Sequence, residues 1–443
     1  MNRKWILAGT LILAKIVVLI AIIFAAKAGF GEVLIHELQW NLFRVESISV
    51  SQDMEWSFDT IEAAELVVDN NGGNITIQPG NSNSIKVEAL VVAWGRTTDL
   101  AQEALEDMRI DVSQDGNKVL VRFYPPAIRA MGTYNRYSAD LTITVPVDTY
   151  VDANTDSGSI KVNGLSADVV LATGYGELEV TDIQGSVRAE TDSGEINAER
   201  LNAGEGRVEL LSDYGDITLE GVFAESLEIQ TGSGSIVLEK SDIDGSADLT
   251  TGFGRIQFTG GGAGSLQIST DSGEIELVDI KVENGLSAEG NFGDIKLNRA
   301  SASSYNLDTD SGWISIEGCS GEITAVTGFG DITVHDAVEA QLNLESDSGK
   351  VIFEGSLGTG PHHLETNYGD IEIFIPDETA LTVDLKTGFG DITSEFSVTV
   401  SGELDEKHWA GTVNGGGSEL TAQTDSGSIT FGYLDSENNQ GRQ

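Results

Sequence analysis

Carboxylates recur at one fixed position along this chain. Directly after a repeated glycine, eight positions are acidic. Pairs of carboxylates ~5–9.5 Å apart carry out acid–base and nucleophilic chemistry in glycosidases. Stacked strands ~4.8 Å apart would produce such distances without any catalytic purpose, so the pattern predicts no catalytic residue. The eight are Glu177, Glu195, Asp216, Glu274, Asp294, Asp331, Asp370 and Asp391, and the nearby Asp192, Asp213 and Asp271 extend the acidic column.

The phrase GFGDI resembles the glycine–aspartate nonapeptides of calcium-binding β-rolls. Those nonapeptides place another residue between the second glycine and the aspartate and repeat every nine residues, whereas this chain does neither. Neighbouring carboxylates could still hold a hard cation between them. Solvated turn residues are the simpler interpretation, so we predict no metal site and no cofactor.

Histidine and cysteine are scarce. The segment PHH at 361–363 is a weak metal-binding candidate, and surface residues are the simpler interpretation. Cys319 lies one repeat before His335, but no third partner and no oxyanion motif accompany them, so we expect Cys319 to be a small buried residue. A single cysteine also excludes an internal disulfide and a four-thiolate metal site. The histidines are His36, His335, His362, His363 and His408.

These residues are positioned by a repeat of about 19 residues. The intervals between its glycines are 18 to 21 residues, except for a last interval of 37. A period of this length, sustained along the chain, indicates a β-solenoid in which neighbouring repeats stack. The glycines are Gly158, Gly176, Gly194, Gly215, Gly234, Gly254, Gly273, Gly293, Gly312, Gly330, Gly349, Gly369, Gly390 and Gly427.

The segments on either side of each glycine alternate apolar and polar residues, as at Ile236 and Leu238. This period of two predicts strands with one buried face. Two residues before the glycine stands Asp, Asn or Gly in every repeat. These residues tolerate positive φ, and Asp and Asn can also close a turn through their side chains, so we expect a sharp corner there. Three residues before it is usually Thr or Ser, and these hydroxyls could bond to one another or to the corner backbone.

The residue directly before the glycine alternates between serine and an aromatic residue over the first twelve repeats. With one repeat per coil, large rings would lie above small serines, and coils ~4.8 Å apart would pack without crowding. With two repeats per coil, the rings would line one edge and the serines another. We favour one repeat per coil, which gives about 14–15 coils over residues 151–432; recent duplication of a two-repeat unit fits either geometry.

The N-terminus has basic residues Arg3 and Lys4 followed by an apolar run over 5–26. Twenty-two helical residues span ~33 Å, enough for a membrane core of ~30 Å. We predict one transmembrane helix within residues 1–30, with the rest of the chain outside the cytoplasm. Lys15, inside the run, is costly there. A cleaved signal peptide is the alternative and would export the chain as well.

Residues 31–60 are predicted to be a tether, and 61–150 a small α+β cap that covers the open edge of the solenoid. Within the cap, Gly73 marks one degenerate repeat. Residues 99–108 should form a short helix, with Asp99 and Gln102 capping its start. Residues 433–443 are polar and predicted to be disordered.

The chain is strongly acidic, with 71 acidic and 25 basic residues and a net charge of -46. Nucleic-acid binding needs a basic surface that neutralises phosphates, so this class of function is excluded. The same charge opposes unwanted self-association.

The segments LVVDNNGGNITIQPG and ADLTITVPVDTYVDANTDSGSIKV, the serial TDSGEI and TGFGDI turns and VNGGGSELTAQTDSGSI occur in order. In these features the chain resembles the putative-adhesin family of bacterial envelope proteins, a β-strand repeat family of unknown function, over residues 60–432. The resemblance implies a β-solenoid in the cell envelope and brings no catalytic residues.

We therefore expect a non-enzymatic, membrane-anchored surface rod that contacts cell-wall or surface polymers or other copies of itself. A polysaccharide-active enzyme on a β-helix and an accessory of an envelope-stress system are the alternatives.

Overall fold

The structure is a computed structural model that describes residues 47–61, 63–126, 136–400 and 405–434. None of the helices in these ranges is long and apolar enough to cross a membrane. The predicted span over 5–26 lies outside the described residues, as do much of the predicted tether and most of the predicted tail. The described part of the tether forms strand β1 (Ile48–Asp59).

The chain forms two compact units. The smaller unit contains helix α3 (Thr98–Asp107), whose Ala101, Ala104 and Leu105 are buried. The helix was predicted at nearly these bounds, but its cap was assigned wrongly. Thr97 is the N-cap, and its side chain accepts a hydrogen bond from the backbone N–H of Leu100 at 3.2 Å. A threonine one residue outside the apolar pattern is a favourable cap.

The larger unit begins with strands that are out of chain order. Strand β2 pairs in parallel with β6 and β8, while β3 pairs in parallel with β7 and β9. The degenerate repeat around Gly73 is therefore a true layer of the solenoid, and the next layer comes from a later part of the chain. The bounds are β2 (Glu65–Asn70), β3 (Ile75–Pro79), β4 (Ser84–Gly95), β5 (Arg109–Asp115), β6 (Lys118–Tyr124) and β7 (Arg136–Val145).

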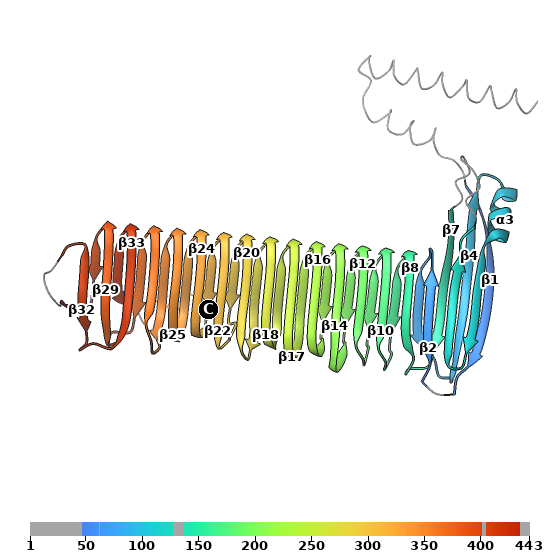
Figure 1. Cartoon of the computed structure of the whole chain (residues 1–443), viewed down its shortest axis with the longest axis horizontal. Helices are drawn as coiled ribbons and strands as arrows, with labels where there is room; N and C mark the ends of the chain where they lie inside the picture. The colour runs from blue at the N-terminus through green and yellow to red at the C-terminus, as the bar shows by residue number, and fades with distance from the viewer. Residues whose placement is uncertain (1–46, 62, 127–135, 401–404, 435–443) are drawn as a thin grey trace, which may run out of the picture. The chain divides into compact units, whose positions relative to one another are not determined.

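From β8 onward, each repeat supplies one strand that ends just before the corner glycine and one that starts two residues after it (Figure 1). Long strands run continuously from one repeat into the next. The bounds are β8 (Tyr150–Ser157), β9 (Ile160–Asn163), β10 (Val169–Tyr175), β11 (Leu178–Thr181), β12 (Val187–Ser193), β13 (Ile196–Glu199), β14 (Asn202–Tyr214), β15 (Ile217–Glu220), β16 (Phe223–Ser233), β17 (Ile236–Phe253), β18 (Ile256–Ser272), β19 (Ile275–Val282), β20 (Gly285–Phe292), β21 (Ile295–Asn298), β22 (Ser304–Ser311), β23 (Ile314–Glu317), β24 (Ser320–Phe329), β25 (Ile332–Ser348), β26 (Val351–Leu357), β27 (His362–Tyr368) and β28 (Ile371–Ile375).

Consecutive repeats pair in parallel and in register. Val169 lies opposite Val187 and Tyr175 opposite Ser193, so one repeat is one turn of the solenoid. The arrangement with two repeats per coil is therefore wrong. Small residues do lie beneath large ones along the same column, as the alternation of serine and aromatic residues indicated.

The number of turns was overestimated. The chain makes about 11 turns, the number of intervals from Gly158 to Gly369, whereas 14–15 coils were predicted. The difference lies at the ends of the solenoid, where layers are assembled from segments that do not follow one another. Counting glycines in the sequence treats those layers as ordinary turns.

The C-terminal layers are exchanged. Strand β33 (Ser418–Ser426) lies between β27 and β29 (Leu381–Phe389), and β34 (Ile429–Tyr433) lies between β28 and β30 (Ile392–Ser394). The chain thus leaves one layer open and returns to fill it. The antiparallel strands β32 (His408–Val413) and β31 (Thr399–Val400) then follow β29 outward. The interval of 37 residues between Gly390 and Gly427 is the length of this detour.

The interior of the solenoid is formed by the buried strand faces that the apolar alternation predicts. Ile236 and Ile275 are fully buried, Ile295 is 1% exposed, and the same alternation continues in every turn. Each turn exposes its apolar face to the turns above and below, so burial depends on stacking.

The glycine corners hold successive turns at close distance. A Cβ on almost any of them would overlap the carbonyl oxygen of the glycine in the adjoining turn, as Gly273 shows against Gly254. That same carbonyl accepts a hydrogen bond from a Thr or Ser hydroxyl of the adjoining turn, at 2.7 to 3.3 Å in thirteen cases. The hydroxyls therefore bond to the corner backbone, one of the two predicted arrangements.

A histidine interrupts the apolar core. His362 is 1% exposed and stands opposite Leu420 in the neighbouring strand. Neither ring nitrogen has a hydrogen-bond partner. Burial lowers the pKa of His362, and the nearby backbone of Gly358 offsets only part of this effect. The prediction that this histidine lies at the surface is wrong, because position 362 belongs to the buried alternation.

Replacing Gly273 by alanine is expected to destabilise the larger unit by about 3 kcal/mol or more, since a Cβ would force apart two turns that share backbone contacts. Denaturant unfolding of the full-length chain measures the loss. Gly290→Ala is the matched control, because its Cβ would meet Thr309 at an ordinary 3.7 Å. Equal midpoints for the two variants would contradict the steric role of the corner.

Gly290 occupies the position that holds Thr or Ser in other turns. Gly290→Thr should therefore stabilise the protein by about 1 kcal/mol, through a hydroxyl bond to the neighbouring corner and through the loss of glycine freedom within a strand. Gly290→Val, which has the same branched shape and no hydroxyl, separates the two contributions. If both variants are equally stable, the hydroxyl bond adds nothing.

His362 should make stability depend on pH. Because burial lowers the pKa of His362 in the folded state, the unfolded chain binds a proton more readily than the folded chain does. The free energy of unfolding is therefore highest above pH ~6.5, the ordinary pKa of histidine, and falls as the pH drops below that value. His362→Leu should therefore gain most over wild type near pH 5. Unfolding curves at pH 5 and pH 8 measure this. The control, His363→Gln, changes a partly exposed histidine and should show the same pH dependence of stability as wild type. If His362→Leu also showed the wild-type pH dependence, His362 would not be its source.

Candidate functional site

The column of carboxylates after the corner glycines has a structural task. The Oδ1 atoms of Asp216, Asp294, Asp331 and Asp370 each accept a hydrogen bond from a backbone N–H of the neighbouring turn, at 2.7 to 3.0 Å. Glu274 instead pairs with Lys296 at 2.5 Å and with Arg255 at 3.5 Å. These side chains join turns together. Proximity between them follows from stacking and does not form an acid–base pair aimed at a common point.

A second corner of each turn escaped the sequence analysis. Six residues after the corner glycine, the backbone is left-handed, with φ between 48° and 70° in ten successive turns. None of the fourteen residues two before the glycine has positive φ, so the corner predicted there is made without left-handed backbone at that position. The signal was present, since seven of the ten are Gly or Asp. They are Gly164, Asp182, Arg200, Gly221, Lys240, Gly260, Asp279, Arg299, Gly318 and Asp336.

Ion pairs link neighbouring turns at this second corner. The Arg200 guanidinium donates to both carboxylate oxygens of Asp182, at 2.6 and 3.0 Å, and Arg299 donates to Asp279 in the same way. These hydrogen bonds lower the pKa of both aspartates. All four side chains are exposed, so water and salt screen the pairs and they contribute little to stability.

Cys319 is the buried small residue that was predicted. It is 4% exposed, and burial raises the pKa of its thiol to about 12. The thiol is therefore protonated at neutral pH and is a poor nucleophile. His335, in the next turn, directs Nδ1 towards Glu354 at 2.8 Å. The structure brings these two residues into neighbouring turns without making them a catalytic pair.

His363 and His408 each lie within hydrogen-bond distance of a nearby carboxylate. Nε2 of His363 lies 3.0 Å from Glu365, and Nε2 of His408 lies 2.7 Å from Asp384. Within the described ranges, no three His, Cys, Asp or Glu side chains are grouped so that they could hold a metal ion.

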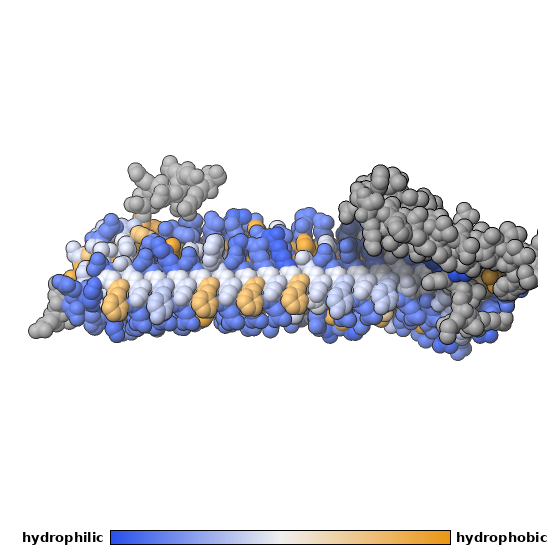
Figure 2. Space-filling model, turned by 90° about the horizontal axis from the view of Figure 1, so that it is seen from above, coloured by the Kyte–Doolittle hydropathy of each residue, from blue (hydrophilic) through white to orange (hydrophobic). Residues whose placement is uncertain are grey.

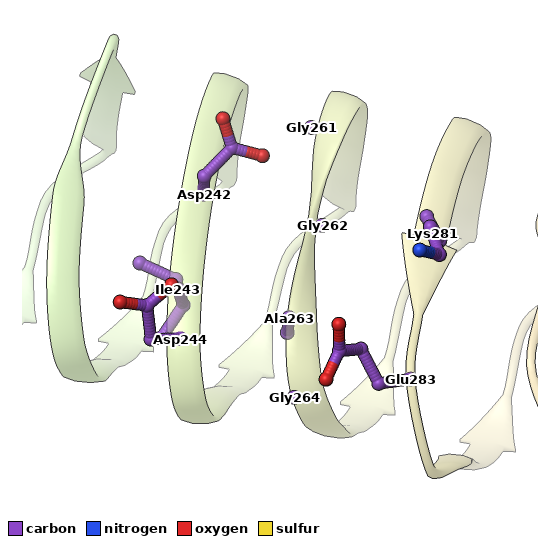
Figure 3. Close-up of a pocket in the computed structure, with 9 residues that line it drawn as sticks. All are labelled: Asp242, Ile243, Asp244, Gly261, Gly262, Ala263, Gly264, Lys281 and Glu283. Carbon is purple, nitrogen blue, oxygen red and sulfur yellow. The ribbon is translucent and has the colours of Figure 1, made fainter.

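A glycine-lined hollow of about 240 Å³ lies on another side of the solenoid. Asp242 and Asp244 border it on one turn, Lys281 and Glu283 on another, with residues 261–264 between them (Figure 3). Cβ atoms on Gly261 and Gly262 would overlap the backbones of the adjoining turns. The hollow is thus explained by a close backbone approach that requires glycine.

The most regular exposed feature is a line of rings along the glycine corners, which we call the aromatic row. One ring stands before the corner glycine in every second turn, 63% to 81% exposed (Figure 2). Trp313, directly after Gly312, is 61% exposed and adds a ring beside the row. The row consists of Tyr175, Tyr214, Phe253, Phe292, Phe329, Tyr368 and Phe389.

The strand exchange preserves this row. In the sequence the alternation fails after Tyr368, because Phe389 follows it without an intervening serine. In space, Ser426 of β33 lies between Tyr368 and Phe389. The alternation of serine and ring therefore runs unbroken through fourteen layers: the twelve from Ser157 to Tyr368, which are joined by the 11 successive turns, and the two exchanged layers of Ser426 and Phe389.

Solved structures with distant similarity come from three bacteria. A putative adhesin from Bacteroides fragilis is 17% identical, with a TM-score of 0.32, covering 56% of this chain and 97% of that one. A putative cell adhesion protein from Clostridium sporogenes is 9% identical, with a TM-score of 0.17, covering 87% and 100%. A putative lipid binding protein from Parabacteroides distasonis is 13% identical, with a TM-score of 0.18, covering 85% and 96%. No curated protein matches the chain.

The family comparison covers most of the chain. The profile of the Toastrack DUF4097 family matches residues 63–260 and again residues 261–431. The expected membership of an adhesin-like β-repeat family is confirmed, because the two matches together span the layers of the solenoid. This chain belongs to the Toastrack DUF4097 family.

Proposed function

We propose that this protein is a non-enzymatic scaffold of the bacterial cell envelope, held in the cytoplasmic membrane by residues 5–26 with the solenoid outside the cytoplasm. Its function is to bind or display through side chains repeated on a stiff lattice. The observation that carries the proposal is the aromatic row, in which one kind of exposed side chain recurs at a constant spacing on stacked backbone.

Repetition favours binding over catalysis. An active site needs a few groups converging on one reacting atom, whereas the row offers equivalent positions along a line. Four of the eight carboxylates considered for a polysaccharide-active enzyme accept hydrogen bonds from backbone N–H groups of the neighbouring turn. No observation on the described residues favours the envelope-stress accessory.

The test of location is protease treatment of intact bacterial spheroplasts that produce the full-length chain. We expect the solenoid to sediment with membranes and to be digested from outside. Ile16→Arg combined with Leu19→Arg should abolish insertion, since each charge near the centre of a span costs about 3 kcal/mol.

The matched control is Ile16→Ala combined with Leu19→Ala, which should still insert. Protection of the wild-type solenoid from external protease would refute the proposed location. The mass of the mature protein decides between an uncleaved anchor and a cleaved signal peptide, because cleavage would remove the apolar run.

A further inference from the structure

We propose that the aromatic row binds an extended, uncharged β-1,4-linked polysaccharide, with its rings stacking against every second sugar. This inference rests on the display function proposed above and names its ligand. Three properties of the row support it: the spacing of the rings, the polar groups between them, and the charge beside them.

The spacing fits a polymer with a two-unit repeat. Turns lie ~4.8 Å apart, so rings on alternate turns lie ~9.6 Å apart, and seven of them span ~58 Å. In an extended β-1,4-linked hexose chain, each sugar is flipped relative to the last. The same sugar face therefore returns every second unit, at nearly the spacing of the rings. Sugar C–H groups pack against aromatic faces, as other apolar groups do.

The spaces between the rings offer hydrogen-bond acceptors. Each intervening turn carries a serine before its glycine, usually preceded by aspartate, as at Asp192–Ser193. Beside Tyr175 the surface forms a hollow of about 400 Å³, bordered by Asp156, Asp192 and Glu190, with Gly174 at its centre. Sugar hydroxyls are donors that can satisfy these carboxylates, while the ring supplies the apolar wall.

Two kinds of polypeptide fit less well. An extended strand presents the same face every ~6.6 Å, which does not match the rings. A polyproline II helix repeats every ~9.3 Å and matches in length. However, proline has no N–H, so such a peptide would place carbonyl acceptors against the carboxylates between the rings, where only the serine hydroxyls could donate to them. A polysaccharide brings hydroxyl donors for these carboxylates, which can only accept.

A membrane and a second copy of the chain are also disfavoured. Binding to a membrane surface requires a broad apolar face with basic residues around it, whereas the row is one ring wide and has aspartates beside it. Two rows could interlock, ring over serine. That contact would bring the aspartate columns of both copies together within a chain of net charge -46, and like charges at an interface are costly.

Isothermal titration of the full-length chain, purified in a mild detergent, tests the proposal. The probes are cellohexaose and chitohexaose, which are β-1,4-linked, and maltohexaose, which is α-1,4-linked and curved. We expect at least one of the β-1,4-linked probes to bind and maltohexaose to bind at least about tenfold more weakly. Polyproline and polylysine peptides of similar length serve as competitors.

The triple variant Phe253→Ser, Phe292→Ser and Phe329→Ser removes three rings. Serine already occupies this position in the neighbouring turns, so the fold should be retained, as thermal unfolding will verify. Affinity should fall by about tenfold or more, because each aromatic contact contributes a few-fold or more. The matched control, Phe223→Ser with Val338→Ser, removes two exposed apolar side chains outside the row and should bind normally.

A second variant keeps the number of rings and breaks their spacing. Phe292→Ser with Ser311→Phe moves one ring to the adjacent turn, and binding should weaken if the two-turn spacing is recognised. Undiminished binding would overturn the spacing argument. Failure of both β-1,4 probes to bind, preferred binding of polyproline, binding of polylysine that the triple variant loses, or dimerisation through the row in sedimentation would each overturn the polysaccharide proposal. The location measured on spheroplasts would stand in any of these cases, so the two proposals fail separately.

Discussion

The close approach of backbone at the glycine corners is the constraint on which this structure depends. Most corner carbonyls accept a hydrogen bond from a hydroxyl of the adjoining turn, and a Cβ on the facing glycine would overlap that same carbonyl oxygen. The hydrogen bond and the steric limit therefore act on one atom. They fix the position of each turn over the last, and in-register pairing of the apolar strands follows. The exterior is regular as a consequence, because side chains at the same position of successive repeats are related by the same shift from one turn to the next.

The exchange of strands at the C-terminal end shows what that shift preserves. Placing β33 between β27 and β29 restores the alternation of serine and ring that the sequence order breaks. Rings on adjacent turns would be ~4.8 Å apart, close enough to crowd, and the inserted Ser426 prevents this for Tyr368 and Phe389. The alternation of serine and ring is therefore complete in the spatial order of the layers and not in the order of the chain, because crowding depends on which turns are neighbours in space. The same exchange leaves the antiparallel β32 and β31 beyond the last full layer, where short strands limit edge pairing.

Much of the repeat was predictable, because each local requirement selects a particular type of residue. Burial of one strand face selects Ile and Leu at every second position, close approach of two backbones selects glycine, and the hydrogen bond to the corner carbonyl selects Thr or Ser. The second corner was missed because Arg200, Lys240 and Arg299 adopt left-handed backbone there and interrupt the series of Gly and Asp that otherwise marks it. His362 was predicted at the surface because buried positions were recognised by their apolar residues, and a histidine at a buried position breaks that pattern. The exchanged strands could not be foreseen, since pairing between β27 and β33 is a long-range choice that no local motif encodes.

Acidic charge and the aromatic row have complementary effects. A line of exposed rings alternating with serines has a self-complementary shape, and shape alone would allow two copies to interlock. The aspartates two residues before many of the corner glycines place like charges on both sides of such a contact, which disfavours it. An uncharged polymer pays no such cost and can contact successive rings one after another. Each contact is weak, but once one ring is engaged the next meets a tethered ligand, so affinity increases with the length of polymer in register. A stiff lattice suits this mode of binding, because flexible spacing between rings would lose part of each added contact to conformational entropy.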